Sequence, residues 1–396
     1  MENIVELYAN QTEKVKSYIG KYDKVYIYGA GEYGRKMIHI LRKFRCEIEG
    51  IVVSDKNGNP ERVLGNKVYA LDEIACDNDK TVFVLGVSDR YIQEIVSTLK
   101  ECGHCNIVKM EGVPCMWQIN REFPKLEITA QMGCSVQCKY CPQSLLYANY
   151  YKEDKNRAKR ISLEDFKTCV DNMPKETIIS FAGFVEPFHH PDAIEMMKYA
   201  YKKGNKLELY TTFVGVTMEM LSELKEIAFQ EVVLHTPDRD NFANIPMTEE
   251  YIKVMDEVLS WKKSDGSPFI DSANCQSEPS DAFLELAGNR IEVKSCLVDR
   301  AGNLDDDSLK RSVYKTGKIT CNRSKALNHW VLLPDGSVVM CCMDFGLKHT
   351  FGNLIQENYE EIIKGKVYNE ALKQLETECG GEEMLCRSCT SSSWVK

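Results

Sequence analysis

Short apolar runs alternate with amphipathic segments in two long parts of the chain, residues 24 to about 110 and 124 to about 303. The first part contains the strand-like runs KVYIYG, EIEGIVV, KTVFVLGV and NIV, and the helix-like segments EYGRKMIHILRKF and DRYIQEIVSTLKECG. Strands that alternate with helices predict a parallel sheet, so we expect an α/β fold here.

The second part repeats this alternation more often. It contains the strand-like runs LEITAQMG, ETIISFAG, KLELYTTFVG, EVVLHTP and RIEVKSCLV, separated by helix-like segments such as SLEDFKTCVDNM and DAIEMMKYAYKKG. Five or six such units predict an open or closed α/β barrel. Functional groups of such folds lie at the C-terminal ends of the strands.

The pattern changes again from about residue 318, where short apolar runs, a turn at Pro334-Asp335-Gly336 and six cysteines follow one another. This texture predicts a separate small domain that needs a metal to fold. We therefore expect three domains, over residues 1–112, 113–305 and 306–396.

Composition and charge exclude several classes of protein. The 396 residues carry 50 basic and 59 acidic side chains, a net charge of -9, so nucleic-acid binding is not expected. No signal peptide and no apolar stretch of about 18 residues is evident, which predicts a cytoplasmic protein without a membrane span. The 17 cysteines should then stay reduced, and their clustering indicates metal binding or catalysis.

A glycine motif follows the first strand-like run. Gly29, Gly31 and Gly34 form G-x-G-x-x-G before a helix, and Asp55 follows the next strand. Such glycines let a backbone approach a diphosphate at a helix N-terminus, and an acid at this spacing can hold a ribose hydroxyl. The alternative is that the glycines serve only strand-to-helix packing. With about 90 residues, the block has the size of one mononucleotide half.

Residues 24 to 110 resemble the small nucleotide-binding domain at the front of sugar O-acetyltransferases and in nucleotide-sugar dehydratases. The resemblance includes the stretch from Val63 to Glu73. It implies a Rossmann-like domain that binds a nucleotide-sugar or another nucleotide-linked ligand rather than NAD.

Three cysteines, Cys134, Cys138 and Cys141, lie within eight residues directly after the first barrel strand. Three thiolates can hold one face of an iron-sulfur cube and leave the fourth iron without a protein ligand. A zinc site would need a fourth ligand, for which His189 and His190 are candidates.

With Tyr140 before the last cysteine, this segment carries the C-x3-C-x-aromatic-C signature and resembles the radical S-adenosylmethionine (SAM) superfamily. The turn with Gly183 and Glu186 looks like the G-x-G-E-P turn that receives the SAM amino group, although Val185 replaces the second glycine. Thr212 lies where the family carries a threonine-rich strand end. The resemblance implies a partial (β/α)6 barrel with Tyr140, Gly183, Glu186 and Thr212 at the SAM site.

A second group of cysteines comprises Cys321, Cys341 and the Cys386-x2-Cys389 pair, with Gly336 five residues before Cys341. Four thiolates suffice for a second 4Fe-4S cluster, and Cys342 can replace Cys341 in this count. The block resembles the SPASM and twitch extensions of radical SAM enzymes, which hold auxiliary clusters. A structural zinc ion is the alternative, because four thiolates suit both metals. Cys102 and Cys105 form an isolated pair without a partner pair nearby.

The functional prediction is a radical SAM oxidoreductase with two 4Fe-4S clusters and SAM as cofactors. It would remove hydrogen from a carbohydrate or nucleotide-linked small molecule, in an alcohol dehydrogenation or an epimerisation, with a flavodoxin- or ferredoxin-like protein as electron donor. Catalytic candidates at strand ends are His235, Cys275 and Arg300. The alternatives are a radical SAM maturase that modifies a ribosomal peptide or protein, and a nucleotide-binding redox sensor.

Overall fold

The computed structural model describes residues 4–8, 12–75, 77–87, 89–111, 123–264, 266–295, 300–303, 317–377 and 384–394. By its internal contacts the chain divides into two compact units. Unit 1 is Met1–Ile119 with Lys262–Pro268, and unit 2 is Asn120–Trp261 with Phe269–Lys396. The predicted domain boundaries at 112/113 and 305/306 lie outside the described residues.

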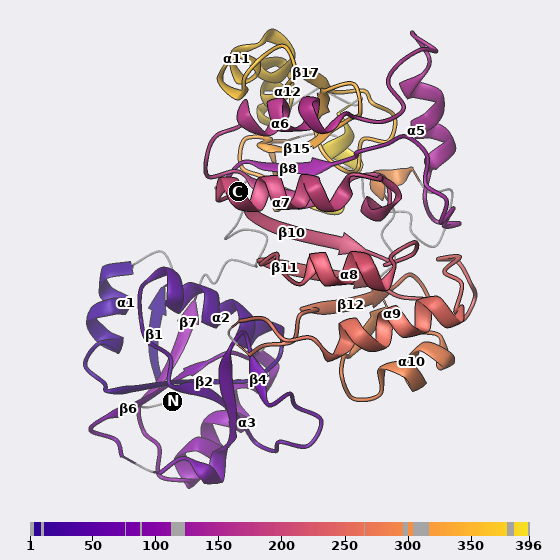
Figure 1. Ribbon diagram of the computed structural model, residues 1–396. Coiled ribbons are helices and arrows are strands. Elements are labelled where there is room, and N and C mark those ends of the chain that lie inside the picture. The colour runs from indigo at the N-terminus through magenta and orange to yellow at the C-terminus, as the bar shows by residue number, and fades with distance from the viewer. Residues whose placement is uncertain are drawn as a thin grey trace. The chain divides into compact units, whose positions relative to one another are not determined.

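Unit 1 contains a seven-stranded sheet in the order β1-β7-β6-β2-β3-β5-β4 (Figure 1). All neighbours pair in parallel except β4 and β5. The strands are β1 (Ile4–Tyr8), β2 (Lys24–Tyr28), β3 (Gly50–Val53), β4 (Arg62–Val63), β5 (Asn66–Ala70), β6 (Thr81–Leu85) and β7 (Ile107–Glu111). The order β5-β3-β2-β6-β7 is that of a doubly wound sheet, with strands on both sides of β2. It is therefore larger than the single mononucleotide half indicated by its length.

Helices cover both faces of this sheet. Helices α1 (Thr12–Ile19) and α2 (Glu32–Lys43) contribute to one hydrophobic core, whereas α3 (Asp89–Glu101) contributes to another. The all-buried patterns of β3 and β6 follow from this coverage, because a parallel sheet between two helix layers has no solvent-facing side.

Unit 2 contains a nine-stranded sheet in the order β13-β12-β11-β10-β9-β8-β15-β16-β17. Six of its strands pair in parallel and in chain order. They are β8 (Lys125–Ile128), β9 (Ile178–Phe181), β10 (Lys206–Thr211), β11 (Glu231–His235), β12 (Ser272–Cys275) and β13 (Val293–Ser295). Within the described residues β8 pairs on its other side with β15 and not with β13, so these strands form an open sheet. The predicted α/β class with a parallel sheet is confirmed.

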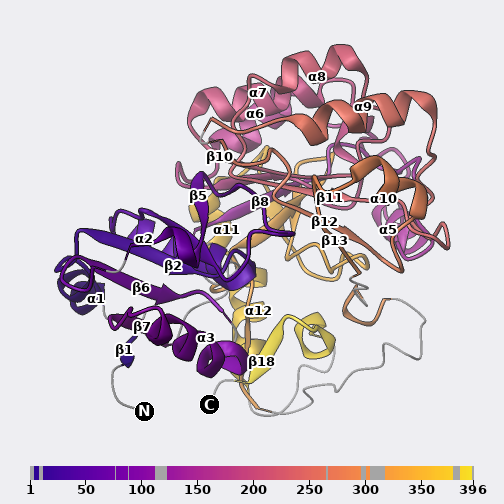
Figure 2. The ribbon, with the colours of Figure 1, turned by 90° about the horizontal axis from the view of Figure 1, so that it is seen from below.

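Figure 2 shows helices along one face of this sheet. The helices of unit 2 that connect the parallel strands are α5 (Gln143–Tyr150), α6 (Leu163–Asp171), α7 (Ala193–Lys203), α8 (Met218–Leu224), α9 (Glu249–Ser260) and α10 (Asp281–Ala287). The apolar faces of α6 to α10 form one continuous core with the strands, whereas α5 contributes Leu146 and Tyr150 to a separate cluster. This packing holds the carboxyl ends of six strands at one edge.

The C-terminal block continues the same sheet. Strands β15 (His329–Leu332), β16 (Ser337–Val339) and β17 (Thr350–Asn353) extend it beyond β8, and β14 (Ile319–Cys321) pairs separately with β18 (Ser392–Trp394). Helices α11 (Tyr359–Lys364) and α12 (Lys366–Glu376) pack on β17. Trp330 is fully buried among the aromatic rings of this block.

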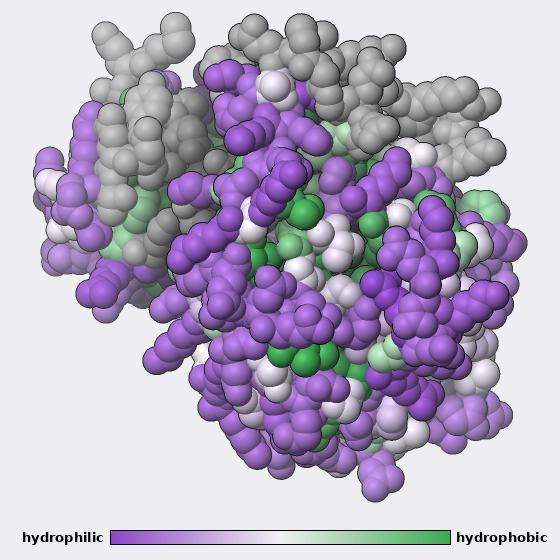
Figure 3. Space-filling view, turned by 90° about the horizontal axis from the view of Figure 1, so that it is seen from above, coloured by the Kyte–Doolittle hydropathy of each residue, from purple (hydrophilic) through white to green (hydrophobic). Residues whose placement is uncertain are grey.

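The surface of the molecule seen in Figure 3 consists mainly of hydrophilic residues, with hydrophobic ones in small groups. Over the described parts of the chain, we find no helix with the length and apolar character needed to cross a membrane.

Candidate iron-sulfur and substrate site

The predicted site residues of unit 2 gather at the carboxyl edge of its parallel strands. The three-cysteine segment follows β8, Gly183 and Glu186 follow β9, and Thr212 follows β10. His235 ends β11, Cys275 ends β12, and Arg300 comes after β13. This edge is where α/β folds of this kind place their chemistry.

The segment after β8 turns sharply around the three cysteines. Gly133, just before the first cysteine, has φ +91°, and Gln137, between the first and the second, has φ +54°. The Cys138 Sγ lies 3.1 Å from the carbonyl oxygen of Ala243, and Gln143 Nε2 lies 3.4 Å from the Cys141 Sγ. Cys134, Cys138 and Cys141 are all free and partly buried.

Burial and spacing distinguish these three thiols. Burial raises the pKa of Cys138 to about 12. Burial also raises the pKa of Cys134, and hydrogen bonds from the backbone N–H groups of Glu186 and Val136 partly offset that rise. The three sulfur atoms do not all lie within 4.8 Å of one another, whereas thiolates on one zinc ion lie roughly 3.8 Å apart. Their wider spacing suits the face of a cube better than one zinc ion.

The two histidines proposed for a zinc site behave differently. His190 is buried, its Nε2 is 3.0 Å from the Ile161 carbonyl oxygen, and its Nδ1 accepts the Asp192 N–H. Both of its nitrogen atoms are therefore used by the scaffold. His189 instead reaches Ser135 Oγ, 3.0 Å from Nε2, next to Cys134.

Glu186 is buried and linked to the end of β10. Its carboxylate accepts hydrogen bonds from Thr211 Oγ1 at 2.5 Å, Thr212 N at 2.8 Å and Thr212 Oγ1 at 2.7 Å. Burial raises the pKa of Glu186, and these donors oppose that shift. Gly183 has φ +65° and leaves no room for a Cβ against Ile128, so glycine is required there.

The catalytic candidates at the other strand ends have distinct partners. His235 Nδ1 lies 2.7 Å from Asn274 Oδ1, and burial together with the Arg300 charge lowers the pKa of His235. This pairing assigns the donor role to Nδ1 of a neutral ring. Cys275 is buried, and its Sγ lies 2.9 Å from the Ser277 carbonyl oxygen.

Arg300 is near the thiols of Cys141, in the first group, and Cys342, the neighbour of Cys341. Burial shifts the pKa values of Cys141 and Cys342 most, and the Arg300 charge lowers both. Arg300 Nε is buried and has no hydrogen-bond partner among the residues that the structure describes. Its backbone has φ +51°, an uncommon conformation outside glycine.

The second group of cysteines also comes together. Besides burial, Cys342 and then Cys386 and Cys389 raise the pKa of Cys341, and Cys321 raises those of Cys386 and Cys389. The backbone N–H of Arg323 donates to the Cys321 sulfur at 3.4 Å. The backbone N–H of Ser391 donates to the Cys389 sulfur, also at 3.4 Å. Such hydrogen bonds suit thiolates that bind a cluster. Cys379 lies outside the described residues.

Cys342 has a different environment from Cys341. Its sulfur lies with Glu127 and His329, whose ligand atoms are all within 4.8 Å of one another. The sequence did not indicate this trio, because 202 residues separate Glu127 from His329. The alternation of hydrophobic and polar residues in β8 was the one available signal.

In unit 1, the predicted glycines lie where β2 and β6 meet. A Cβ on Gly34 would be 2.9 Å from the Gly29 carbonyl carbon, and one on Gly86 would be 2.7 Å from the Gly34 Cα. Gly86 was not predicted. Gly31 differs, because its Cβ position has nothing within 4 Å. Asp55 is exposed after β3 and accepts the Asn57 N–H at 2.9 Å.

Comparison with known families gives one match. Residues 321–390 match the SPASM family, described as an iron-sulfur cluster-binding domain. The matched range contains all the cysteines of the second group, so the C-terminal block is an iron-sulfur cluster-binding domain. No curated protein matches the chain.

Solved structures resemble the chain only distantly. BtrN in complex with AdoMet and 2-DOIA is 16% identical, with a TM-score of 0.45 over 68% of this chain and 93% of its own. Streptococcus suis SuiB bound to precursor peptide SuiA is 12% identical, with a TM-score of 0.44 over 80% of this chain and 77% of its own. Native anSMEcpe with bound AdoMet is 15% identical, with a TM-score of 0.37 over 67% of this chain and 86% of its own. Similarity at this level assigns neither an activity nor a substrate.

Proposed function

We propose that this chain is a radical SAM oxidoreductase with a SAM-binding 4Fe-4S cluster on Cys134, Cys138 and Cys141. The observation that carries the proposal is the position of the three-cysteine segment at the same sheet edge as the Glu186–Thr212 contact. A three-thiolate cluster with an open iron needs an adjacent site for its ligand, and a buried carboxylate suits the ammonium group of that ligand.

A second cluster on Cys321, Cys341, Cys386 and Cys389 completes the proposed cofactor set. When bound, SAM and the two clusters would supply a 5′-deoxyadenosyl radical for hydrogen abstraction and an acceptor for one electron. The side chains between the two cysteine groups would bind the substrate, and Arg300 is the clearest of them because its charge lowers the pKa of Cys141 and of Cys342, the neighbour of Cys341.

His235 and Arg300 have complementary roles in this proposal. A neutral His235 that donates through Nδ1 keeps Nε2 as an acceptor for a proton from a carbinol group. The Arg300 guanidinium would bind the oxygen on which negative charge develops during alcohol oxidation. Epimerisation is the close variant, with Cys275 as a candidate hydrogen donor.

The substrate is proposed to be a carbohydrate or a nucleotide-linked sugar. In unit 1, the crevice between β2 and β6 is the switch point at which doubly wound sheets bind their ligands. Gly31 opens α2 and has space where its side chain would be, so a diphosphate can approach that backbone. Asp55 would hold a ribose hydroxyl.

An electron donor of the flavodoxin or ferredoxin type is the proposed protein partner. An open cavity of about 410 Å³ lies beside Cys134 and is also lined by Lys159, Arg160 and His189. The positive charges of Lys159 and Arg160 suit the acidic surface of such a donor, which must come close to the first cluster.

The proposal is tested with the anaerobic full-length protein, SAM, a reductant and a panel of nucleotide sugars that carry deuterium at their carbinol positions. We expect deuterium in 5′-deoxyadenosine and a ketone or an inverted centre in the sugar. Transfer of hydrogen from a precursor peptide, with a change in peptide mass, would instead identify a maturase. Cofactor binding without any 5′-deoxyadenosine would identify a redox sensor.

A further inference from the structure

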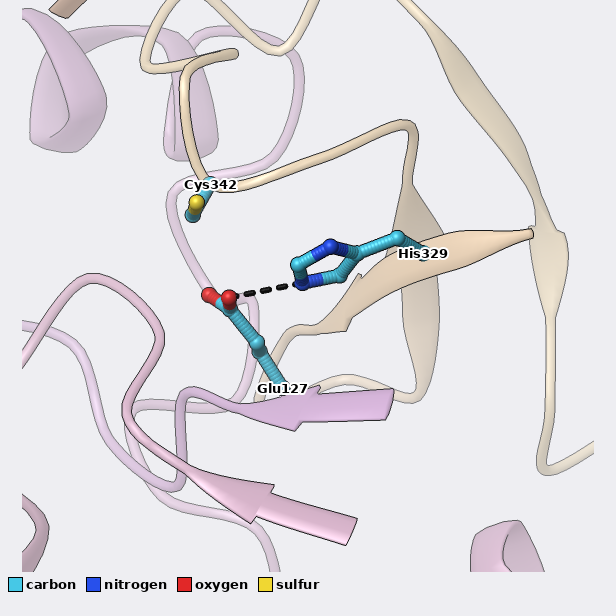
Figure 4. Close-up of side chains that lie close together, drawn as sticks. All are labelled: Glu127, His329 and Cys342. Carbon is cyan, nitrogen blue, oxygen red and sulfur yellow. Dashed lines mark hydrogen bonds and ion pairs between the residues drawn. The ribbon is translucent and has the colours of Figure 1, made fainter. Parts of the chain in front are cut away.

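Glu127, His329 and Cys342 converge from three separate parts of unit 2. Glu127 is on β8, His329 is on the neighbouring strand β15, and Cys342 follows β16. One ligand atom from each lies within 4.8 Å of the other two (Figure 4). Among the described residues, this is the only group of three or more potential ligands of these kinds at that spacing.

Burial makes this group of three unusual. Glu127 is 7% exposed and His329 is 5% exposed, and their Oε1 and Nε2 atoms lie 2.7 Å apart. Charged side chains are seldom buried so fully unless they are paired or bind a metal. The Glu127–His329 contact provides a pair, and Figure 4 shows the Cys342 sulfur close to the same carboxylate.

The adjacent residues Cys341 and Cys342 have different neighbours. Cys342, Cys386 and Cys389 all raise the pKa of Cys341, and the last two are proposed cluster ligands. The Cys342 sulfur itself lies within 4.8 Å of ligand atoms of Glu127 and His329. This geometry places Cys342 at a second site.

The surrounding charges suit a divalent cation on this group. With the ion bound, Glu127 and a Cys342 thiolate would supply two negative ligand charges to one M²⁺ ion, and His329 would bind as a neutral ring. Arg323 Nη1 lies 4.0 Å from the Cys342 Sγ, where its charge can stabilise the thiolate without occupying a ligand position. Lys125 is paired with Glu208 at 2.5 Å, so its charge is already compensated.

We propose that Glu127, His329 and Cys342 bind one divalent cation of borderline softness, such as Zn²⁺, at a site separate from both iron-sulfur clusters. Oxygen, nitrogen and sulfur ligands together favour this class of ion over Mg²⁺ or Ca²⁺. On ion binding the single ring proton of His329 would move from Nε2 to Nδ1 and the Cys342 thiol proton would pass to solvent. The 2.7 Å contact would widen toward the roughly 3.3 Å between ligands of tetrahedral zinc. Three protein ligands leave a fourth position for water or a substrate oxygen.

The test is the metal content of anaerobically reconstituted full-length protein that is exposed to Zn²⁺ and then desalted. Wild type should retain about one zinc ion per chain in addition to its iron and sulfide. His329→Ala and Cys342→Ser should each lose that zinc and keep iron and sulfide unchanged. The control Cys169→Ser, which removes a buried thiol of the core, should retain the zinc. Cys341→Ser should lose iron and retain the zinc.

Unchanged zinc in both ligand variants, or no retained zinc in wild type, would overturn the proposal, as would a loss of iron in Cys342→Ser. If the variants do not fold, zinc X-ray absorption of wild type decides the question. One sulfur with nitrogen and oxygen ligands supports the site. A shell of four sulfur atoms would place the zinc on the cluster cysteines and contradict it.

Discussion

Glu186 Oε2 accepts two hydrogen bonds from Thr212, one from the backbone N–H at 2.8 Å and one from Oγ1 at 2.7 Å. The contact joins the turn after β9 to the end of β10, beside the three-cysteine segment. Because these donors fix the carboxylate in a buried position, Glu186 is preorganised for an incoming ammonium group.

We predict that Glu186→Ala weakens SAM binding by about tenfold or more, because a charge-assisted hydrogen bond contributes about 1.5–3 kcal/mol. Equilibrium binding of SAM to the reconstituted protein measures the effect. Iron and sulfide contents should stay at wild-type levels, and Glu164→Ala on the exposed side of α6 should have no effect. Equal SAM affinity in wild type and Glu186→Ala would refute this role.

The cluster assignment predicts iron contents. Reconstituted wild type should contain about eight iron atoms, and the triple variant Cys134→Ala/Cys138→Ala/Cys141→Ala should retain about half of them. Cys386→Ala/Cys389→Ala should lose the other half. A wild-type content of about four iron atoms with four-sulfur-bound zinc would contradict the auxiliary cluster.

Two glycines of unit 1 are predicted to have different roles, Gly31 in ligand binding and Gly34 in stability. Gly31→Val should fold normally, because Gly31 has φ -81° and open space at its Cβ position, yet it should lose affinity for nucleotide sugars. Gly34→Ala should destabilise the fold by about 1–3 kcal/mol or more through its clash with the Gly29 carbonyl group.

Calorimetric titration and urea unfolding of the full-length variants measure the two effects. Binding of NAD but of no nucleotide sugar would contradict the proposed ligand. Unchanged nucleotide-sugar affinity in Gly31→Val would show that the glycine motif serves only strand-to-helix packing.

Glu231 predicts a pH dependence of stability. Burial, with Glu208 adding to it, raises the pKa of Glu231 from 4.5 to about 7. The folded state therefore holds a proton that the unfolded state releases between these pH values, so stability falls as the pH rises from about 4.5 to 7. Glu231→Gln keeps an acceptor for Tyr210 Oη and avoids this loss.

At pH 8 the Glu231→Gln variant should be more stable than wild type by on the order of 1 to 3 kcal/mol, and the difference should shrink toward pH 5. Urea unfolding midpoints at several pH values measure it. A difference independent of pH would show that Glu231 ionises normally in the folded protein.

The features predictable from the sequence are those that depend on residues close together in the chain. The parallel strands, the cysteine segment after β8 and the position of Glu186 at the turn after β9 follow from periodicity and short motifs. The N-terminal strand β1 was missed, because its partner β7 is about 100 residues away and IVELY alone reads as part of an amphipathic segment.

Contacts between distant segments were not predictable. Sequence spacing does not determine whether Cys341 or Cys342 is the cluster ligand. That depends on the directions of two adjacent side chains in the turn after β16. Glu127 and His329 come together because β15 pairs with β8. No sequence motif predicts this pairing or its register. Arg300 lies near Cys141 and Cys342 and has a backbone conformation, φ +51°, that its sequence does not indicate.

The central claim is that the cluster on Cys134, Cys138 and Cys141 cleaves SAM reductively. The most direct measurement is 5′-deoxyadenosine formation by the anaerobic full-length protein with SAM and dithionite. We expect 5′-deoxyadenosine and methionine from wild type and from the buried-thiol control Cys169→Ser, and none from Cys138→Ala. No 5′-deoxyadenosine from wild type with a full iron content, or equal amounts from Cys138→Ala, would contradict the account.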